Sequence, residues 1–289
     1  MRRFLLLIVG FWAAQATAGG SFLISTDELA TKLAAKLGQV RLVDAEGAEN
    51  YARAHLSGAV NLPFMELEDA EENAKTGLPI FPRLAASKLE ALGISRETDV
   101  VVYDSGDGRG ASALWYILGF LGHDKVRILD GGFRKWLKEG RSVTQDAAWG
   151  GQPPVKVAYL AQPRADWAVK TQGLATSPAL LVDARSIAEF SGKESGGARQ
   201  GGHVPGAKSF VWSQLAGDLA TFKDDAAMRK ALTEAGLTPD KEIVTYCNGG
   251  LGRSTYLYAA LKLLGYEKVK VYPGSWIEWA ADPIRPIER

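Results

Sequence analysis

Short apolar runs recur along the chain and alternate with stretches of helical periodicity. Residues 111–121 and 254–264 show the helical pattern. The apolar runs span residues 40–43, 100–103, 126–129, 180–182, 243–246 and 269–272. Runs without polar alternation are typical of strands that are covered on both faces. The pattern therefore predicts an α/β fold with parallel sheets that carry helices on both faces.

The two halves of the chain repeat one pattern at a constant offset. Asp104 aligns with Cys247 and Trp136 aligns with Trp279, and both pairs lie 143 positions apart (247 minus 104, 279 minus 136). A looser match joins residues 42–46 to residues 181–185. Two copies of one domain explain these matches. Because ligands of such sheets bind beyond the carboxyl ends of the strands, Cys247 lies where a site is expected.

Breaks in the periodicity set the predicted domain boundaries. Residues 21–140 and 164–289 form the two domains, and residues 141–163 form a linker in which Gly and Pro interrupt every period. The second copy also carries an insertion, residues 192–202, that is rich in glycine and charge. We predict that this insertion is a surface loop.

The first 18 residues resemble a secretory signal peptide. Two arginines precede a short apolar run, and Ala16-Thr17-Ala18 follows as a cleavage pattern of small residues. This pattern predicts an exported protein, periplasmic in a bacterium with two membranes. No further apolar stretch approaches spanning length, so no membrane contact is expected after cleavage.

The composition of the chain argues against two kinds of binding partner, nucleic acid and metal ions. With 34 Lys and Arg against 33 Asp and Glu, the chain offers no charge excess that would attract nucleic acid. One cysteine and three scattered histidines lack the spacing of metal ligands, so no metal is predicted. His55 and His203 occupy equivalent turns of both halves, which favours a structural role. His123 aligns with Tyr266 at a helix end, and we expect it to be solvated.

Cys247 ends an apolar run and is followed by three glycines and a helical pattern. A helix N-terminus carries unsatisfied N–H donors and a partial positive charge, which stabilise an anion such as a thiolate. Glycines let successive amides point inward. We therefore predict a nucleophilic cysteine cradled by loop amides. The alternative is a buried apolar cysteine before an ordinary turn.

Taken together, the motifs resemble the tandem-domain rhodanese family. The resemblance covers nearly all of the chain after residue 18. It rests on the Val-Asp and His-x-x-Gly-Ala elements of both halves, on Tyr246-Cys247, and on the closing motifs at 131–136 and 274–279. In that family only the C-terminal copy keeps the cysteine, and Asp104 fits the catalytically silent copy.

The resemblance implies a sulfurtransferase without a cofactor. The Cys247 thiolate would take a sulfane sulfur from a small anionic donor such as thiosulfate and pass it from a persulfide to a thiol or cyanide. Arg185 matches an arginine of active domains that binds the donor; the alternative is a surface arginine paired with Glu189. The predicted substrate-binding residues are Arg185, Asn248, Gly249, Gly250, Leu251, Gly252 and Arg253.

Three alternatives stay open. The spacing of Cys247 and Arg253 also resembles cysteine-dependent phosphatases, in which the arginine binds phosphate in bidentate fashion. The loop lacks both the basic residues common in thiosulfate-preferring relatives and the Gly-Ser-Gly of mercaptopyruvate-preferring ones, so 3-mercaptopyruvate stays open as the donor. A non-catalytic sulfur carrier would hold sulfur on Cys247 without passing it on. Trp276 follows the closing glycine of the second half, where it could line the pocket.

Overall fold

The computed structural model describes residues 21–35, 40–67, 82–148, 157–174 and 177–289. The predicted signal peptide and the centre of the predicted linker lie outside these residues. The N-terminal half contains β1 (Leu23–Ile24), α1 (Thr26–Ala34), β2 (Val40–Asp44), α2 (Ala48–Arg53), β3 (His55–Leu56), β4 (Val60–Asn61), a 3-10 turn η1 (Phe64–Glu66), α4 (Pro82–Ala91), β5 (Asp99–Tyr103), α5 (Arg109–Phe120), β6 (Val126–Leu129), α6 (Gly132–Lys138) and β7 (Val143–Thr144).

The C-terminal half repeats the central alternation of strands and helices. It contains η2 (Ala165–Trp167), α7 (Thr171–Leu174), β8 (Leu180–Asp183), α8 (Ile187–Phe190), β9 (Lys208–Ser209), η3 (Trp212–Leu215), η4 (Asp218–Ala220), α9 (Asp225–Glu234), β10 (Ile243–Tyr246), α10 (Arg253–Leu263), β11 (Val269–Val271) and α11 (Ser275–Ala281). The bounds of α6 and α11 differ by the predicted 143 positions at both ends.

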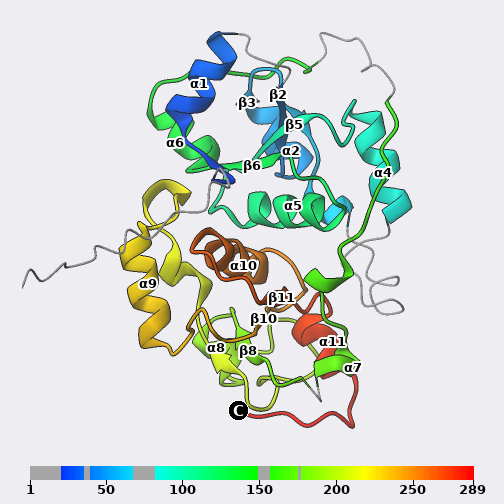
Figure 1. The fold of residues 1–289 in the computed structure, drawn as a ribbon, viewed down its shortest axis with the longest axis vertical. Coiled ribbons are helices and arrows are strands. Elements are labelled where there is room, and N and C mark those ends of the chain that lie inside the picture. The colour runs from blue at the N-terminus through cyan, green and yellow to red at the C-terminus, as the bar shows by residue number, and fades with distance from the viewer. Residues whose placement is uncertain (1–20, 36–39, 68–81, 149–156, 175–176) are drawn as a thin grey trace, which may run out of the picture.

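Each half has a parallel sheet, as the apolar runs predicted. The N-terminal sheet has the order β1-β6-β5-β2-β4 and the C-terminal sheet has the order β11-β10-β8-β9. Figure 1 shows the two halves as two lobes, with helices packed around each sheet. Both central strands, β5 and β10, are almost wholly buried.

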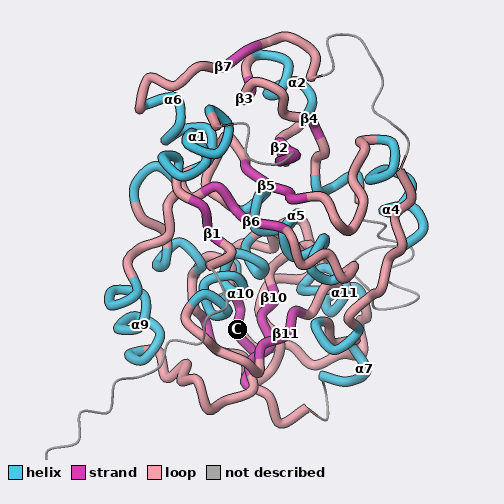
Figure 2. The backbone as a smooth tube through the Cα atoms, turned by 45° about the horizontal axis from the view of Figure 1, so that its top comes forward, coloured by secondary structure: helices cyan, strands magenta, loops and turns pink. Residues whose placement is uncertain are grey.

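Helices α5 and α10 pack against each other between the two sheets (Figure 2). Both are buried along most of their length, because each covers its own sheet with one face and the other half of the molecule with the opposite face. The rings of Tyr116 and Tyr258 meet edge to face at 5.1 Å in this interface. One hydrophobic core therefore runs through both halves.

The ends of the predicted linker are packed onto the N-terminal half. Strand β7 pairs antiparallel with β3, and Tyr159 is buried. None of the helices in the described part of the chain combines the length and apolar character that a bilayer crossing requires.

Candidate active site

Cys247 lies between a buried strand and a helix N-terminus, as its sequence context predicted. Strand β10 ends at Tyr246 and helix α10 begins at Arg253, so residues 247–252 form the connecting loop, here called the Cys247 loop. The cysteine is only 2% exposed. Its N–H donates to Ser275 Oγ over 3.1 Å, and its thiol donates to the carbonyl oxygen of Leu251 over 3.4 Å.

Ser275 fixes the base of this loop. It adopts a left-handed conformation with a φ of 51°, and its hydroxyl donates to Tyr272 O while it accepts the Cys247 N–H. A non-glycine residue in this conformation is strained, and the surrounding hydrogen bonds must hold it there. The first helical turn of α11 therefore anchors the nucleophile.

Gly250 has no room for a side chain. Its φ is +107°, and a Cβ would lie 2.0 Å from Pro273 O. We expect Gly250→Ala to displace the Cys247 loop and to lower sulfur uptake by Cys247 at least about tenfold, since strain of this kind costs roughly 1–3 kcal/mol. Gly249→Ala is the matched control, because nothing lies within 4 Å of its Cβ. Equal rates of persulfide formation in both variants would show that the close approach to Pro273 does not matter.

The loop amides do not all point at the sulfur in this structure. Among the described residues no N–H of the Cys247 loop donates to Sγ; the thiol is seen instead as a donor to Leu251 O. The expected cradle is therefore not assembled around the protonated thiol. A thiolate cannot donate this bond, so the contact with Leu251 depends on the proton.

The N-terminal copy shows which amides of this type of loop donate to an acceptor group at the position of the cysteine. The Asp104 carboxylate accepts N–H bonds from Gly106 (3.1 Å), Gly108 (3.1 Å) and Ala111 (2.9 Å). At the repeat offset, the corresponding amides in the other copy are those of Gly249, Leu251 and Ser254. An anion one atom beyond the Cys247 sulfur would face the same set of donors. The silent copy carries a carboxyl group in this place; burial raises the pKa of Asp104, and the N–H bonds from Ala111 and Gly108 oppose that shift.

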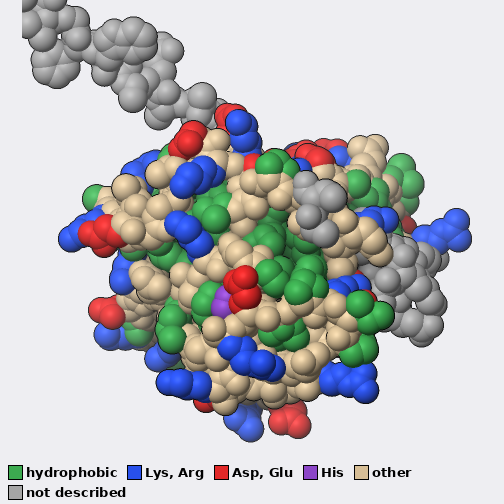
Figure 3. Space-filling model, turned by 90° about the horizontal axis from the view of Figure 1, so that it is seen from below, with side chains coloured by type: hydrophobic (Ala, Val, Ile, Leu, Met, Phe, Trp, Pro, Cys, Tyr) green, Lys and Arg blue, Asp and Glu red, His purple; other side chains and the backbone are tan. Residues whose placement is uncertain are grey.

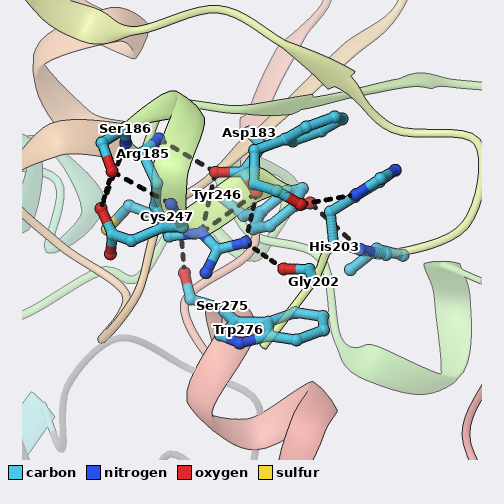
Figure 4. Close-up of polar contacts among 12 residues, drawn as sticks. Asp183, Arg185, Ser186, Gly202, His203, Tyr246, Cys247, Ser275 and Trp276 are labelled. Carbon is cyan, nitrogen blue, oxygen red and sulfur yellow. Dashed lines mark hydrogen bonds and ion pairs between the residues drawn. The ribbon is translucent and has the colours of Figure 1, made fainter. Parts of the chain in front are cut away.

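Arg185 is buried rather than exposed, and its partner is Asp183 rather than Glu189. Its guanidinium donates to the Asp183 carboxylate (2.6 Å) and to Gly202 O (2.7 Å), and it lies 4.9 Å from the centre of the Trp276 ring. Figure 4 shows this side chain between Asp183 and Trp276, next to Cys247. The surface alternative is therefore wrong. Among the described residues, nothing accepts a hydrogen bond from Nη1 of Arg185.

The silent copy lacks this guanidinium, and the pKa of its equivalent aspartate, Asp44, is raised. Glu46 stands at the position of Arg185, so no cation pairs with Asp44 among the residues that the structure describes. Burial, together with the charges of Glu46 and Asp104, raises the pKa of Asp44 to about 6, although hydrogen bonds from Glu46 N–H and Tyr103 oppose the shift.

This difference predicts a pH-dependent stability. Because the folded pKa of Asp44 lies above its ordinary value of 3.8, stability falls as pH rises through the interval between these values, and the loss persists above it. Asp44→Asn should therefore raise the free energy of unfolding by about 1–3 kcal/mol at pH 8 and change it little at pH 4. Urea titrations at both pH values test this, with the exposed Asp99→Asn as control. A gain at pH 4 that equals the gain at pH 8 would contradict it.

Arg253 is the first residue of α10 and is bound to a carboxylate. Its Nη1 and Nη2 donate to the two oxygens of Glu189 over 2.5 and 2.9 Å. Burial works to lower the pKa of Arg253, but the bond to Glu189 and the charges of Cys247, Glu189 and Asp183 raise it by more. Burial likewise works to raise the pKa of Glu189, and Arg253 and Ser186 lower it by more. Both groups are therefore held in their charged forms.

The insertion of the second copy folds against the site. Asn248 Nδ2 donates to Gly196 O (2.6 Å), Trp276 Nε1 donates to Gln200 O (3.0 Å), and Arg185 donates to Gly202 O. The prediction of a surface loop gave its exposure but missed this contact. Trp276 is fully buried against Arg185, so the expectation that it lines the pocket is wrong.

Cys247 opens into a cleft between the two halves. This cleft of about 470 Å³ is lined from the C-terminal half by Cys247, Gly249, Leu251, Gly252 and Arg253. The N-terminal half contributes residues of the Asp104 loop and of the segments after β2 and β4, including Glu46, Phe64, Met65, Asp107 and Arg109. Gly249, Leu251, Gly252 and Arg253 of the predicted set therefore meet here. Gly250 lies against Pro273 instead, Asn248 turns toward the insertion, and Arg185 lies behind the loop.

The three histidines lie away from this cleft. His55 and His203 bind the backbone oxygens of Tyr51 and Phe190, whose rings they also stack on, which agrees with a structural role. His123 is 1% exposed and bonds Thr98 O, so the expectation of a solvated ring is wrong. Burial lowers its pKa. No cluster of metal-ligating side chains occurs in the part of the chain that the structure describes.

A larger hollow of about 940 Å³ lies elsewhere in the C-terminal half. Its walls include Leu174, Leu181, Val204 and Trp279, and it contains neither Cys247 nor the loop amides. Figure 3 views the molecule from below, where hydrophobic side chains gather in the middle of the face and charged side chains surround them. The nucleophile belongs to the smaller cleft.

Comparisons with known proteins agree with the repeat and the fold. The Rhodanese-like domain matches residues 25–139 and 165–282. The thiosulfate sulfurtransferase of Pseudomonas aeruginosa is 31% identical over 271 residues, which cover 92% of this chain and 96% of that protein. The sulfur carrier protein TtuD of Thermus thermophilus is 36% identical over 209 residues, which cover 67% and 72% of the two chains.

A solved structure shares the architecture. The anaerobic ergothioneine biosynthesis enzyme from Chlorobium limicola, in complex with trimethyl histidine, superposes with a TM-score of 0.81 at 24% identity. The match covers 93% of this chain and 70% of that enzyme, and at this identity it shows the fold alone. The two matched repeats and the relatives at over 30% identity show that this chain belongs to the rhodanese family and is a sulfurtransferase.

Proposed function

We propose that this protein moves the sulfane sulfur of thiosulfate to a thiol or to cyanide through a persulfide on Cys247. The observation that carries the proposal is the Asp104 carboxylate, which accepts three N–H bonds in the silent copy. In the catalytic copy, the equivalent amides of Gly249, Leu251 and Ser254 would donate to the terminal sulfur of a persulfide. That sulfur is negatively charged and lies as far along the Cys247 side chain as the carboxyl oxygens lie along Asp104.

Sulfur transfer takes place in two steps. The Cys247 thiolate attacks the outer sulfur of thiosulfate, the S–S bond of the donor breaks, and sulfite leaves with the bonding electron pair. An acceptor thiolate or cyanide then attacks the terminal sulfur of the persulfide, and Cys247 leaves as a thiolate. No cofactor is needed, because neither step requires an external oxidant or reductant.

The electrostatics favour this reaction over phosphate ester hydrolysis. Both terminal nitrogens of Arg253 are engaged by Glu189, so a phosphate could bind them in bidentate fashion only by displacing that carboxylate. For the sulfur donor, Nη1 of Arg185, which has no acceptor in the described part of the chain, is a candidate anion contact behind the loop.

Mass spectrometry of the intact protein tests the proposal. After incubation with thiosulfate, we expect the protein to gain the mass of one sulfur atom and to lose it again when cyanide or a thiol is added. 3-Mercaptopyruvate and an aryl phosphate serve as parallel substrates. Absence of a persulfide with thiosulfate would refute this donor, and faster loading by 3-mercaptopyruvate would assign that donor instead.

A sulfur carrier is the second candidate, because one relative bears that name. A persulfide that forms but does not discharge to small acceptors would favour the carrier. We also propose export, on the pattern of residues 1–18. Recovery of a shortened chain from the periplasmic fraction, with its N-terminus after Ala18, tests that expectation.

A further inference from the structure

The wall of the cleft opposite Cys247 belongs to the silent half, and it carries acidic groups. Glu46, Asp104, Asp107 and Arg109 line this side. The silent half therefore supplies charge to the reaction site although it supplies no nucleophile. An acceptor that enters the cleft passes between the thiol and these side chains.

The two cations that line the cleft are already neutralised. Arg109 pairs with Asp107 over 2.7 Å, and Arg253 pairs with Glu189 over 2.5 Å. Among the described lining residues, this leaves two carboxyl groups without a cation, those of Glu46 and Asp104. The Asp104 carboxyl is 3% exposed, and its oxygens accept backbone N–H bonds.

Glu46 is the carboxylate that is open to the cleft. Its Oε1 accepts the Ser105 N–H over 3.1 Å and its Oε2 accepts from Asn50 Nδ2 over 3.0 Å. These two neutral donors hold the group in place and leave its charge uncompensated. At the same position of the repeat, the catalytic half carries Arg185, so the sign of the charge is reversed between the two copies.

We propose that Glu46 selects the second substrate by charge and favours acceptor thiols that carry a cationic group, such as aminothiols, over anionic thiols. The inference rests on the proposed persulfide. The acceptor thiolate attacks the terminal sulfur, the Cys247 S–S bond breaks, and a new S–S bond forms on the acceptor. Because the acceptor enters between Cys247 and the silent half, an ammonium group on it approaches Glu46. The same carboxylate repels the dianionic donor in the first step.

The test separates the two half-reactions. Protein preloaded with thiosulfate and freed of excess donor is discharged with cysteamine (cationic), 2-mercaptoethanol (neutral) or 3-mercaptopropionate (anionic), and loss of the sulfur mass is followed in time. Each rate for Glu46→Gln is divided by the wild-type rate for the same thiol, which cancels intrinsic thiol reactivity. Glu49→Gln is the matched control, because Glu49 is an exposed neighbour on α2 outside the cleft lining.

We expect Glu46→Gln to slow discharge by cysteamine about threefold, to leave 2-mercaptoethanol unchanged, and to speed both 3-mercaptopropionate and loading by thiosulfate about threefold. A rate change of this size is expected when one charge is removed and solvent partly screens its interaction with the charged group of the substrate. The change should become smaller at high salt. Equal changes for all thiols, or no change for any, would overturn the inference while the persulfide stands. Failure to load wild-type protein would instead refute the proposed function.

Discussion

Cys247→Ser forms no persulfide with thiosulfate and transfers sulfur at least about 1000-fold more slowly than the wild type, and its urea unfolding midpoint stays close to the wild-type value. A serine hydroxyl stays protonated at neutral pH and is a far weaker nucleophile than a thiolate. The fold tolerates the change because the sulfur makes one weak polar contact, with Leu251 O at 3.4 Å, which a hydroxyl can replace.

The single cysteine makes this experiment clean. Any sulfur that the wild type gains and cyanide removes must reside on Cys247, since the chain has no other thiol. Iodoacetamide added before thiosulfate should block loading of the wild type and leave the mass of Cys247→Ser unchanged. Sulfur transfer by the serine variant at a tenth of the wild-type rate or more would remove the persulfide mechanism.

Local sequence patterns predicted the strands, the internal repeat and the position of the nucleophile. The run at residues 243–246 and the helical pattern at 254–264 became β10 and α10 with a shift of one residue in the helix. These elements follow from short-range periodicity and from glycines that permit one type of turn. The constant offset alone predicts that Asp104 and Cys247 lie in equivalent loops.

Pairings between distant residues were beyond such patterns. Arg253 and Glu189 are 64 positions apart, and a charged residue can pair with any opposite charge that the fold brings near. The sequence does carry one indication of the interface between α5 and α10. Residues 111–120 are apolar on all sides, whereas a helix that covers one sheet needs only one apolar face. His123 shows the converse error, since polar residues follow it in sequence and yet its ring is buried and bonds Thr98 O.

The two copies have divided their electrostatic roles. The catalytic copy carries Arg185 beside Asp183, and the silent copy carries Glu46 beside Asp44. A guanidinium therefore lies behind the nucleophile (Figure 4), and a carboxylate lines the cleft on the opposite side. In the proposed reaction the guanidinium would favour the anionic donor, whereas the carboxylate would repel that donor and favour a cationic acceptor.

Removal of the Arg185 side chain should be among the most destabilising single changes in the protein. Both Arg185 and Asp183 are fully buried and joined by a bidentate ion pair from Nε to Oδ1 and from Nη2 to Oδ2, so Arg185→Ala leaves an uncompensated charge in the core. Such a change costs about 3–5 kcal/mol. Urea titration of Arg185→Ala at pH 7 measures it, and a loss below about 1 kcal/mol would show that the pair does not form in solution.

A double variant separates this structural role from donor binding. Asp183→Asn combined with Arg185→Met removes both charges and keeps an elongated side chain on the Trp276 ring, so most of the lost stability should return. If Arg185 also contacts thiosulfate through its unpartnered Nη1, this folded variant loads with a KM for thiosulfate at least about tenfold above the wild type. An unchanged KM in the stable double variant would restrict Arg185 to holding the core behind the Cys247 loop, and the loop amides would then be the principal anion contacts.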